Sequence, residues 1–172
     1  QSEGPWKIAN FLGRRNAKKP GPYFLPARIG VTELSRAARD LYSRGEMQKA
    51  CEVLESAIRC APNHPEVVYN LGCVRQDMKE IREAMKHFRK TLQLEPRHVG
   101  ARLDLATIYY AGGDLNEAAE LLTEGIRRVP HAEEFRQLLV ECLRKANYDV
   151  PEGYAEVGTP QLRLVKYDDM QR

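Results

Sequence analysis

The chain lacks the features from which most catalytic and metal sites are built. Its four cysteines show no C-x-x-C spacing, which excludes a zinc-ribbon pattern. There is no Gly-rich phosphate loop, no nucleophile motif and no paired metal-ligand spacing. Its acidic residues are spread over the predicted helix faces, where exposure to water is the ordinary explanation. The sequence therefore predicts a protein that is not an enzyme and that needs neither a metal nor a cofactor.

Long hydrophobic runs are also missing. No segment approaches the length of a transmembrane helix, and no cleavable signal peptide is visible. Cys51, Cys60, Cys73 and Cys142 are expected to be small buried side chains in a reducing, intracellular compartment. The four histidines are expected to lie at the surface. The cytoplasm and an organelle remain alternatives.

The middle of the chain has no excess charge of either sign. The net charge is +3, and residues 1–30 hold six basic residues against one acidic residue. Residues 147–172 hold three basic residues against five acidic ones, so residues 31–146 are neutral. Nucleic-acid binding needs a basic stripe. It is therefore disfavoured, and only the basic N-terminal segment could support it.

What the sequence does contain is a repeat with a period of 34 residues. Pro62, Pro96 and Pro130 mark it, and small or apolar residues recur at fixed distances before each proline. A constant period of this size is typical of stacked supersecondary units. The residues that precede the prolines by twenty-four, twelve and eight positions are Ala38, Gly72, Ala106; Ala50, Ala84, Ala118; and Leu54, Phe88, Leu122.

The spacing resembles that of the tetratricopeptide repeat (TPR) family, whose signature ends in A-x3-F and a later proline. The second unit carries Leu71, Gly72, Ala84, Phe88 and Pro96 at the signature positions. No unit has the Trp of the signature, and only the second keeps Leu-Gly. The resemblance implies an all-α, right-handed α-α superhelix, and a surface for binding proteins in place of catalysis.

Apolar residues recur every three to four positions within each unit, which independently predicts amphipathic helices. The predicted organisation is an arm (1–30), three repeats (31–64, 65–98, 99–132), a capping helix (133–146) and an extended tail (147–172). Gly45 and Gly112-Gly113 are expected to end first helices. Lys79-Glu80 stands at the matching place in the second unit. The predicted helices are 31–44, 47–60, 65–78, 81–94, 99–111, 115–128 and 133–146.

In the family, the first helix of each pair lines a concave groove that binds peptides or partner segments. The resemblance places a mixed, weakly charged groove here, with tyrosines as binding anchors. Packing of these tyrosines between helices is the alternative. The predicted groove residues are Arg39, Tyr42, Tyr69, Asn70, Cys73, Gln76, Leu103, Thr107 and Tyr110.

One TPR subclass grips the C-terminal carboxylate of heat-shock chaperones with five polar or cationic residues. The matching positions here are Ser35, Arg39, Asn70, Gly100 and Asp104, and only Asn70 agrees with that subclass. An aspartate would repel a carboxylate. The sequence therefore predicts no clamp for a chaperone C-terminus.

The N-terminal arm combines aromatic residues, basic residues and three closely spaced prolines. Prolines favour an extended backbone, and a simple spacer would not need so many aromatic side chains. The arm is predicted to pack, either on its own first helix pair, on a partner protein or on a lipid surface. Its predicted docking residues are Trp6, Phe11, Arg14, Arg15, Tyr23, Phe24 and Leu25.

The C-terminal tail contains an alternating, β-prone stretch at 161–167. Addition to a partner's sheet and a loose chain end are both open. Together these features predict an interaction scaffold, an accessory subunit or assembly factor of a multiprotein complex. The alternatives are a transient adaptor that binds extended client peptides, and an interaction domain cut from a larger enzyme.

Overall fold

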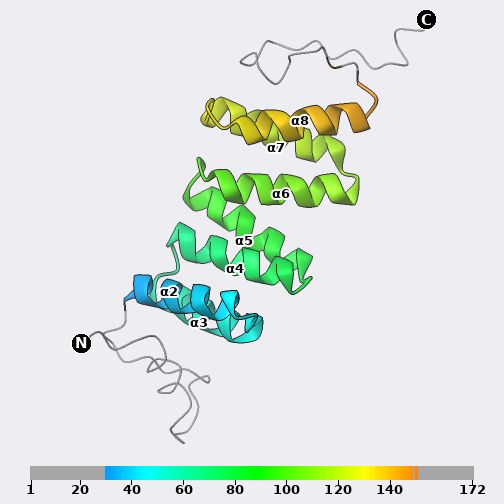
Figure 1. Ribbon diagram of the computed structural model, residues 1–172. Helices are drawn as coiled ribbons and strands as arrows, with labels where there is room; N and C mark the ends of the chain where they lie inside the picture. The colour runs from blue at the N-terminus through cyan, green and yellow to red at the C-terminus, as the bar shows by residue number, and fades with distance from the viewer. Residues whose placement is uncertain (1–29, 149, 151–172) are drawn as a thin grey trace, which may run out of the picture. The chain divides into compact units, whose positions relative to one another are not determined.

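The computed structural model describes residues 30–148 and residue 150, and this part of the chain folds into seven α-helices (Figure 1). The helices confirm the predicted ones to within a residue at each end, and no strand occurs among the described residues. The predicted N-terminal arm (1–30), apart from Gly30, and most of the predicted extended tail (147–172) lie outside the described residues. The helices are α2 (Val31–Ser43), α3 (Met47–Cys60), α4 (Pro65–Asp77), α5 (Ile81–Leu94), α6 (Val99–Gly112), α7 (Leu115–Arg128) and α8 (Glu133–Lys145).

The chain forms two compact units, divided within α5 between His87 and Phe88. In the first unit, α2, α3 and α4 enclose a core that includes Leu34, Leu54 and Val67. In the second, α6, α7 and α8 enclose another core. Each helix contributes one apolar stripe, so each unit buries its own hydrophobic cluster.

Small residues lie at the predicted close approaches of the helices. Ala50, Ala84 and Ala118 are each 0% exposed, as the repeat register predicts. Phe88 and Leu122, from the same signature, are also fully buried. The small and apolar residues of the 34-residue period are therefore core residues, and their burial explains why the register is strict, whereas the three prolines that mark the period are exposed.

The four first helices end in the same left-handed turn. Gly45, Lys79, Gly113 and Asn147 have φ values of 78°, 65°, 89° and 60°, and they are spaced 34 residues apart. At each of them two backbone hydrogen bonds close the helix end, such as Glu80 N–H to the Arg75 carbonyl at 2.9 Å. This pattern is a Schellman motif. The second unit therefore keeps the turn even though lysine replaces glycine.

Two arginines take the place of the missing signature Trp. Arg102 and Arg136 are the fourth residues of α6 and α8, and each donates to the carbonyl of the proline six residues earlier. Arg102 is 5% exposed and also donates to the Leu121 carbonyl at 3.3 Å. Burial lowers the pKa of Arg102. The bonds to Pro96 and Pro130 satisfy carbonyls just after the ends of α5 and α7, which the sequence did not reveal.

The prediction of buried cysteines and surface histidines is partly wrong. Cys51 and Cys142 are buried, but Cys60 is exposed and Cys73 is half-buried. His87 and His98 are half-buried, while His64 and His131 are exposed. The His98 Nδ1 accepts the Ala101 N–H at 3.0 Å and caps α6. None of the described helices is long and apolar enough to cross a membrane.

Candidate functional site

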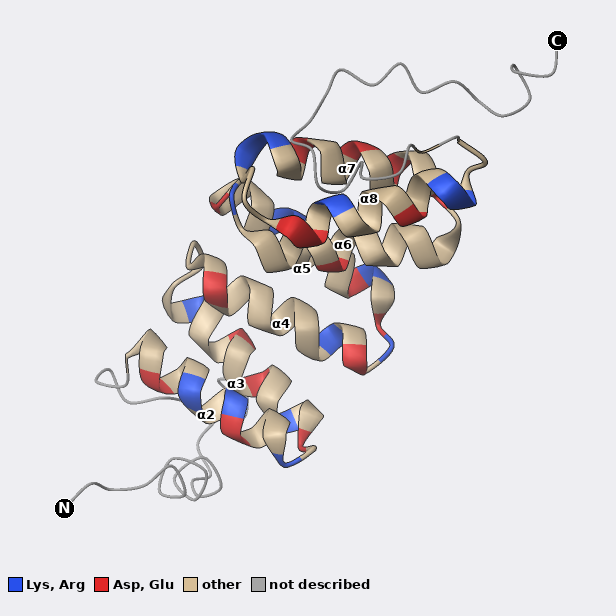
Figure 2. Cartoon of the chain, turned by 45° about the horizontal axis from the view of Figure 1, so that its top comes forward, with Lys and Arg blue, Asp and Glu red and all other residues tan. Residues whose placement is uncertain are grey.

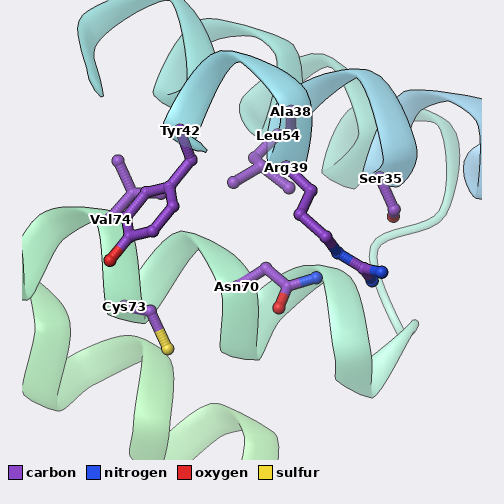
Figure 3. A pocket seen from close by; sticks show the side chains of 8 residues that line it. All are labelled: Ser35, Ala38, Arg39, Tyr42, Leu54, Asn70, Cys73 and Val74. Carbon is purple, nitrogen blue, oxygen red and sulfur yellow. The ribbon is translucent and has the colours of Figure 1, made fainter. Parts of the chain in front are cut away.

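A cavity of about 270 Å³ lies in the first unit, where α2 faces α4 (Figure 3). Its apolar wall comes from both of these helices and from α3. Its polar side chains come from the exposed face of α2 and the facing side of α4. The lining residues are Ser35, Ala38, Arg39, Tyr42, Leu54, Asn70, Cys73 and Val74.

The helical period explains how these side chains meet. Ser35, Arg39 and Tyr42 are four and three positions apart, so they share one face of α2. Asn70 and Cys73 are three apart on α4 and share a face there. Four of the residues predicted for the groove, Arg39, Tyr42, Asn70 and Cys73, therefore line one cavity.

One part of the cavity offers polar groups to a ligand. The Arg39 and Asn70 side chains extend on the same side of the cavity, away from Tyr42 (Figure 3). Arg39 is exposed, and no acidic side chain among the described residues forms an ion pair with it. The Ser35 hydroxyl is buried and has no hydrogen-bond partner among the described residues. This side can donate to a carbonyl or a carboxylate.

At the other end, the Tyr42 ring covers an apolar wall. The Tyr42 hydroxyl donates to the Asp77 carboxylate at the end of α4. This hydrogen bond, with partial burial and the nearby negative charge, raises the pKa of Tyr42 to about 12. The bond fixes the ring beside Val74, although the residue keeps 38% of its surface exposed. The cavity thus pairs a polar side with an apolar side.

Two other predicted groove residues of α4, Tyr69 and Gln76, are half-buried and do not line this cavity. In the second unit, Leu103 and Tyr110 of α6 are half-buried and pack against the core, while Thr107 is exposed. Lys145 Nζ lies 4.2 Å from the centre of the Tyr110 ring. Whether these residues bind a partner stays a prediction.

Sequence reasoning missed Asp77 and the apolar wall. Asp77 matters because it orients Tyr42 from 35 residues away, and no local pattern signals such a contact. Leu54 was recognised only as repeat core, and Val74 was not singled out. The predicted docking residues of the arm lie outside the described residues.

In the view of Figure 2, basic and acidic residues are mixed within each unit. In the first unit, Arg75 pairs with Glu55 of α3 at 2.5 Å and with Glu80 after α4. In the second, Glu124 pairs with Arg127 and Arg128 along α7. Among the described residues, no group of three or more His, Cys, Asp or Glu could hold a metal ion.

The comparisons with known proteins agree with this architecture. Residues 75–142 match the family model described as tetratricopeptide repeat. Among solved structures, the chain is similar to "Crystal structure of MamA protein", with a TM-score of 0.61 and 19% identity over 67% of this chain and 63% of that one. It is also similar to "First TPR of Spaghetti (RPAP3) bound to HSP90 peptide SRMEEVD", with a TM-score of 0.62 and 15% identity. That match covers 67% of this chain and 92% of the other.

The curated relatives are longer proteins. A "Probable biofilm formation methyltransferase WspC" of Pseudomonas putida is 31% identical over 57% of this chain and 23% of the relative. A "Tetratricopeptide repeat and J domain-containing co-chaperone DNJ1" of Fusarium oxysporum is 28% identical over 74% of this chain and 24% of the relative. The chain spans about a quarter of the length of both.

The period, the helix pairs, the repeated turns and these matches define the class of protein. The fold is an all-α helical repeat, and it provides a module for protein–protein interaction. Residues 75–142 match the tetratricopeptide-repeat family, and the described helices have the fold of solved TPR structures.

Proposed function

We propose that this chain is a non-catalytic scaffold that binds a segment of a partner protein, as an accessory subunit or assembly factor of a multiprotein complex. The observation that carries the proposal is the cavity between α2 and α4. It unites an unpaired cation, an amide and a buried hydroxyl with an apolar wall. This mixture suits a peptide better than a small polar metabolite, because a peptide offers both backbone polar groups and apolar side chains.

The geometry favours an extended segment. The Asn70 amide carries both a donor and an acceptor, which match the carbonyl and N–H of a peptide group. Arg39 would pair with an acidic side chain of the segment. The wall formed by Tyr42, Leu54 and Val74 would take an apolar side chain next to it. We therefore propose a ligand with an apolar residue close to an acidic one, held without its chain terminus.

A free C-terminal carboxylate is a poorer ligand by this reasoning. The chaperone-binding subclass surrounds that group with several cations, whereas Asp104 and Gly100 stand at two of the matching positions here. Arg39 alone supplies positive charge. The similar structure of the Spaghetti domain with its peptide shares the fold at 15% identity, and it does not transfer its ligand to this chain.

A second candidate function is that of an interaction domain within a longer enzyme. Two of the relatives carry transferase names, the WspC methyltransferase and a human "Protein O-mannosyl-transferase TMTC3". This chain covers only 23% and 10% of them. In this alternative the groove would position a substrate protein or a second domain, and the described residues would still bind without catalysing.

The test is the quantitative recovery of partners from cells with tagged full-length chain. Asn70→Ala should weaken binding of the true partner about thirtyfold, because losing two peptide hydrogen bonds costs about 1 kcal/mol each. Arg39→Glu should weaken it further by placing repulsion where a cation is needed. Asn63→Ala and Arg36→Glu are matched controls, since both residues are exposed and lie outside the cavity.

A deletion of residues 1–30 distinguishes a stable subunit of a complex from a transient adaptor. A stable subunit that uses the aromatic arm should lose its complex on this deletion, and high salt should weaken an arm that docks through its basic residues. A transient adaptor should lose its clients through the cavity variants alone. If the cavity variants and the deletion all recover the same partners as wild type, the proposed scaffold role is wrong.

A further inference from the structure

A second groove, of about 490 Å³, lies in the second unit between α7 and the end of α8. It is unrelated to the cavity between α2 and α4. On one side it is lined by α7, and on the other by the last turn of α8 and the residues that follow. The lining residues are Asn116, Ala119, Glu120, Thr123, Glu124, Arg127, Leu143 and Tyr148.

The face of α7 that lines this groove is more exposed than the equivalent face of α3, two repeats earlier. Cys51 and Ser56 of α3 are 1% and 3% exposed. Their equivalents 68 positions later are Ala119 and Glu124 of α7, and both are only half-buried. Thr123, at the equivalent position to Glu55, is exposed. α7 is the last second helix of the described chain, so this face lacks the cover that a following helix would give.

α8 stands at the position of the first helix of a fourth unit. It ends in the same Schellman motif as the earlier first helices, with Asn147 in the left-handed turn and Tyr148 N–H bonded to the Leu143 carbonyl at 3.0 Å. After Gly45 and Gly113 the same turn leads directly into a second helix. The sequence beyond α8 contains Pro151, Gly153, Gly158 and Pro160, which oppose a helix there.

We propose that residues 151–172 of this same chain dock in extended form into the groove between α7 and α8. The chain already enters it, because Tyr148 and Val150 pack against the core cluster that contains Leu143. The remaining 22 residues can span about 3.3 Å each, far more than the length of α7 at about 1.5 Å per residue.

The composition of the tail matches the groove. Leu162 and Leu164 alternate with Arg163, so an extended segment would turn apolar side chains toward Ala119 and a cation toward solvent or toward Glu120. No cation among the described residues pairs with Glu120, whereas Glu124 is held by its two arginines. The tether raises the effective concentration of the tail to about the millimolar range, which favours it over a separate partner.

The test is limited trypsin proteolysis of the full-length chain, followed by mass spectrometry at Arg163 and Lys166. A synthetic peptide of residues 151–172 gives the rate for an undocked tail. We expect cleavage in the intact chain to be about tenfold slower than in the peptide, since docking leaves only a minor open population to the protease. Ala119→Arg, which fills the groove, should restore the rate of the peptide. Ala111→Arg, an exposed alanine of α6 outside the groove, should leave the slow rate unchanged.

Three results would overturn the proposal. Equal cleavage rates in the chain and in the peptide would show an undocked tail. Slow cleavage that persists in Ala119→Arg, with helix content unchanged by circular dichroism, would place the tail elsewhere. Protection that rises with protein concentration, together with dimers in sedimentation, would assign the groove to a second copy. The comparison of wild-type chain with peptide remains decisive even if Ala119→Arg unfolds.

Discussion

Lys79 offers the sharpest test of the repeat geometry. It holds a left-handed backbone conformation, with φ of 65°, at a position where the first and third units have glycine. An L-residue with a Cβ pays about 1–2 kcal/mol for that conformation. Its side chain is exposed, so replacing it removes little packing. Lys79→Gly should therefore relieve the strain of the turn after α4.

Part of the stabilisation expected for Lys79→Gly is offset by an effect on the unfolded state. Glycine gives the unfolded chain about 0.5–1 kcal/mol of extra conformational freedom relative to a residue with a side chain. The net stabilisation should be about 0.5–1 kcal/mol. For a chain of this size it corresponds to a rise in Tm of about 1–4 °C.

The assay is thermal and urea unfolding of the full chain, followed by circular dichroism, with Lys79→Ala as the matched control. Alanine removes the long side chain but keeps the Cβ strain, so it should leave stability close to that of wild type. The difference in unfolding free energy between the two variants therefore reports the effect of backbone conformation, separate from the loss of the lysine side chain. If Lys79→Gly is no more stable than Lys79→Ala, the left-handed turn is not strained and the reasoning fails.

Three further perturbations follow from the packing and the hydrogen bonds. Ala84→Leu should lower the free energy of unfolding by about 1–3 kcal/mol, because a fully buried position is overpacked; unchanged urea unfolding would contradict the register. Gly125→Ala should destabilise by a similar amount, since its Cβ would lie 2.6 Å from Arg102 Cδ, and a neutral Tm would argue against that contact. The raised pKa of Tyr42 means that its bond to Asp77 stabilises the fold below about pH 10 and is lost as pH rises toward about 12. Tyrosinate absorbance should therefore show a late titration that Tyr42→Phe removes.

The repeat register and the helices follow from the sequence alone. A 34-residue period with small residues at fixed places can be satisfied only by helix pairs that approach closely, and Ala50 and Ala118 are buried as that requires. The sequence also predicted the helix ends where glycine occurs, at Gly45 and Gly113. Lys79 and Asn147 take the same turn without the glycine signal, because the packing of the repeat imposes the backbone conformation.

The sequence predicted only some of the residues and contacts of the candidate site. Projection of the family groove located Arg39, Tyr42 and Asn70, since residues on one helical face are fixed by spacing. The sequence could not show that Asp77 holds the Tyr42 hydroxyl, nor that Arg102 replaces an aromatic residue by bonding to backbone carbonyls.

The sequence by itself therefore determined the class of fold, the helix boundaries and the candidate groove face, because these depend on local periodicity. Tertiary structure decided which side chains meet across 35 residues and which face of α7 stays half-covered. Such contacts depend on how separate helices pack against one another, and helix packing is set by the shapes of many side chains together, which no short pattern records.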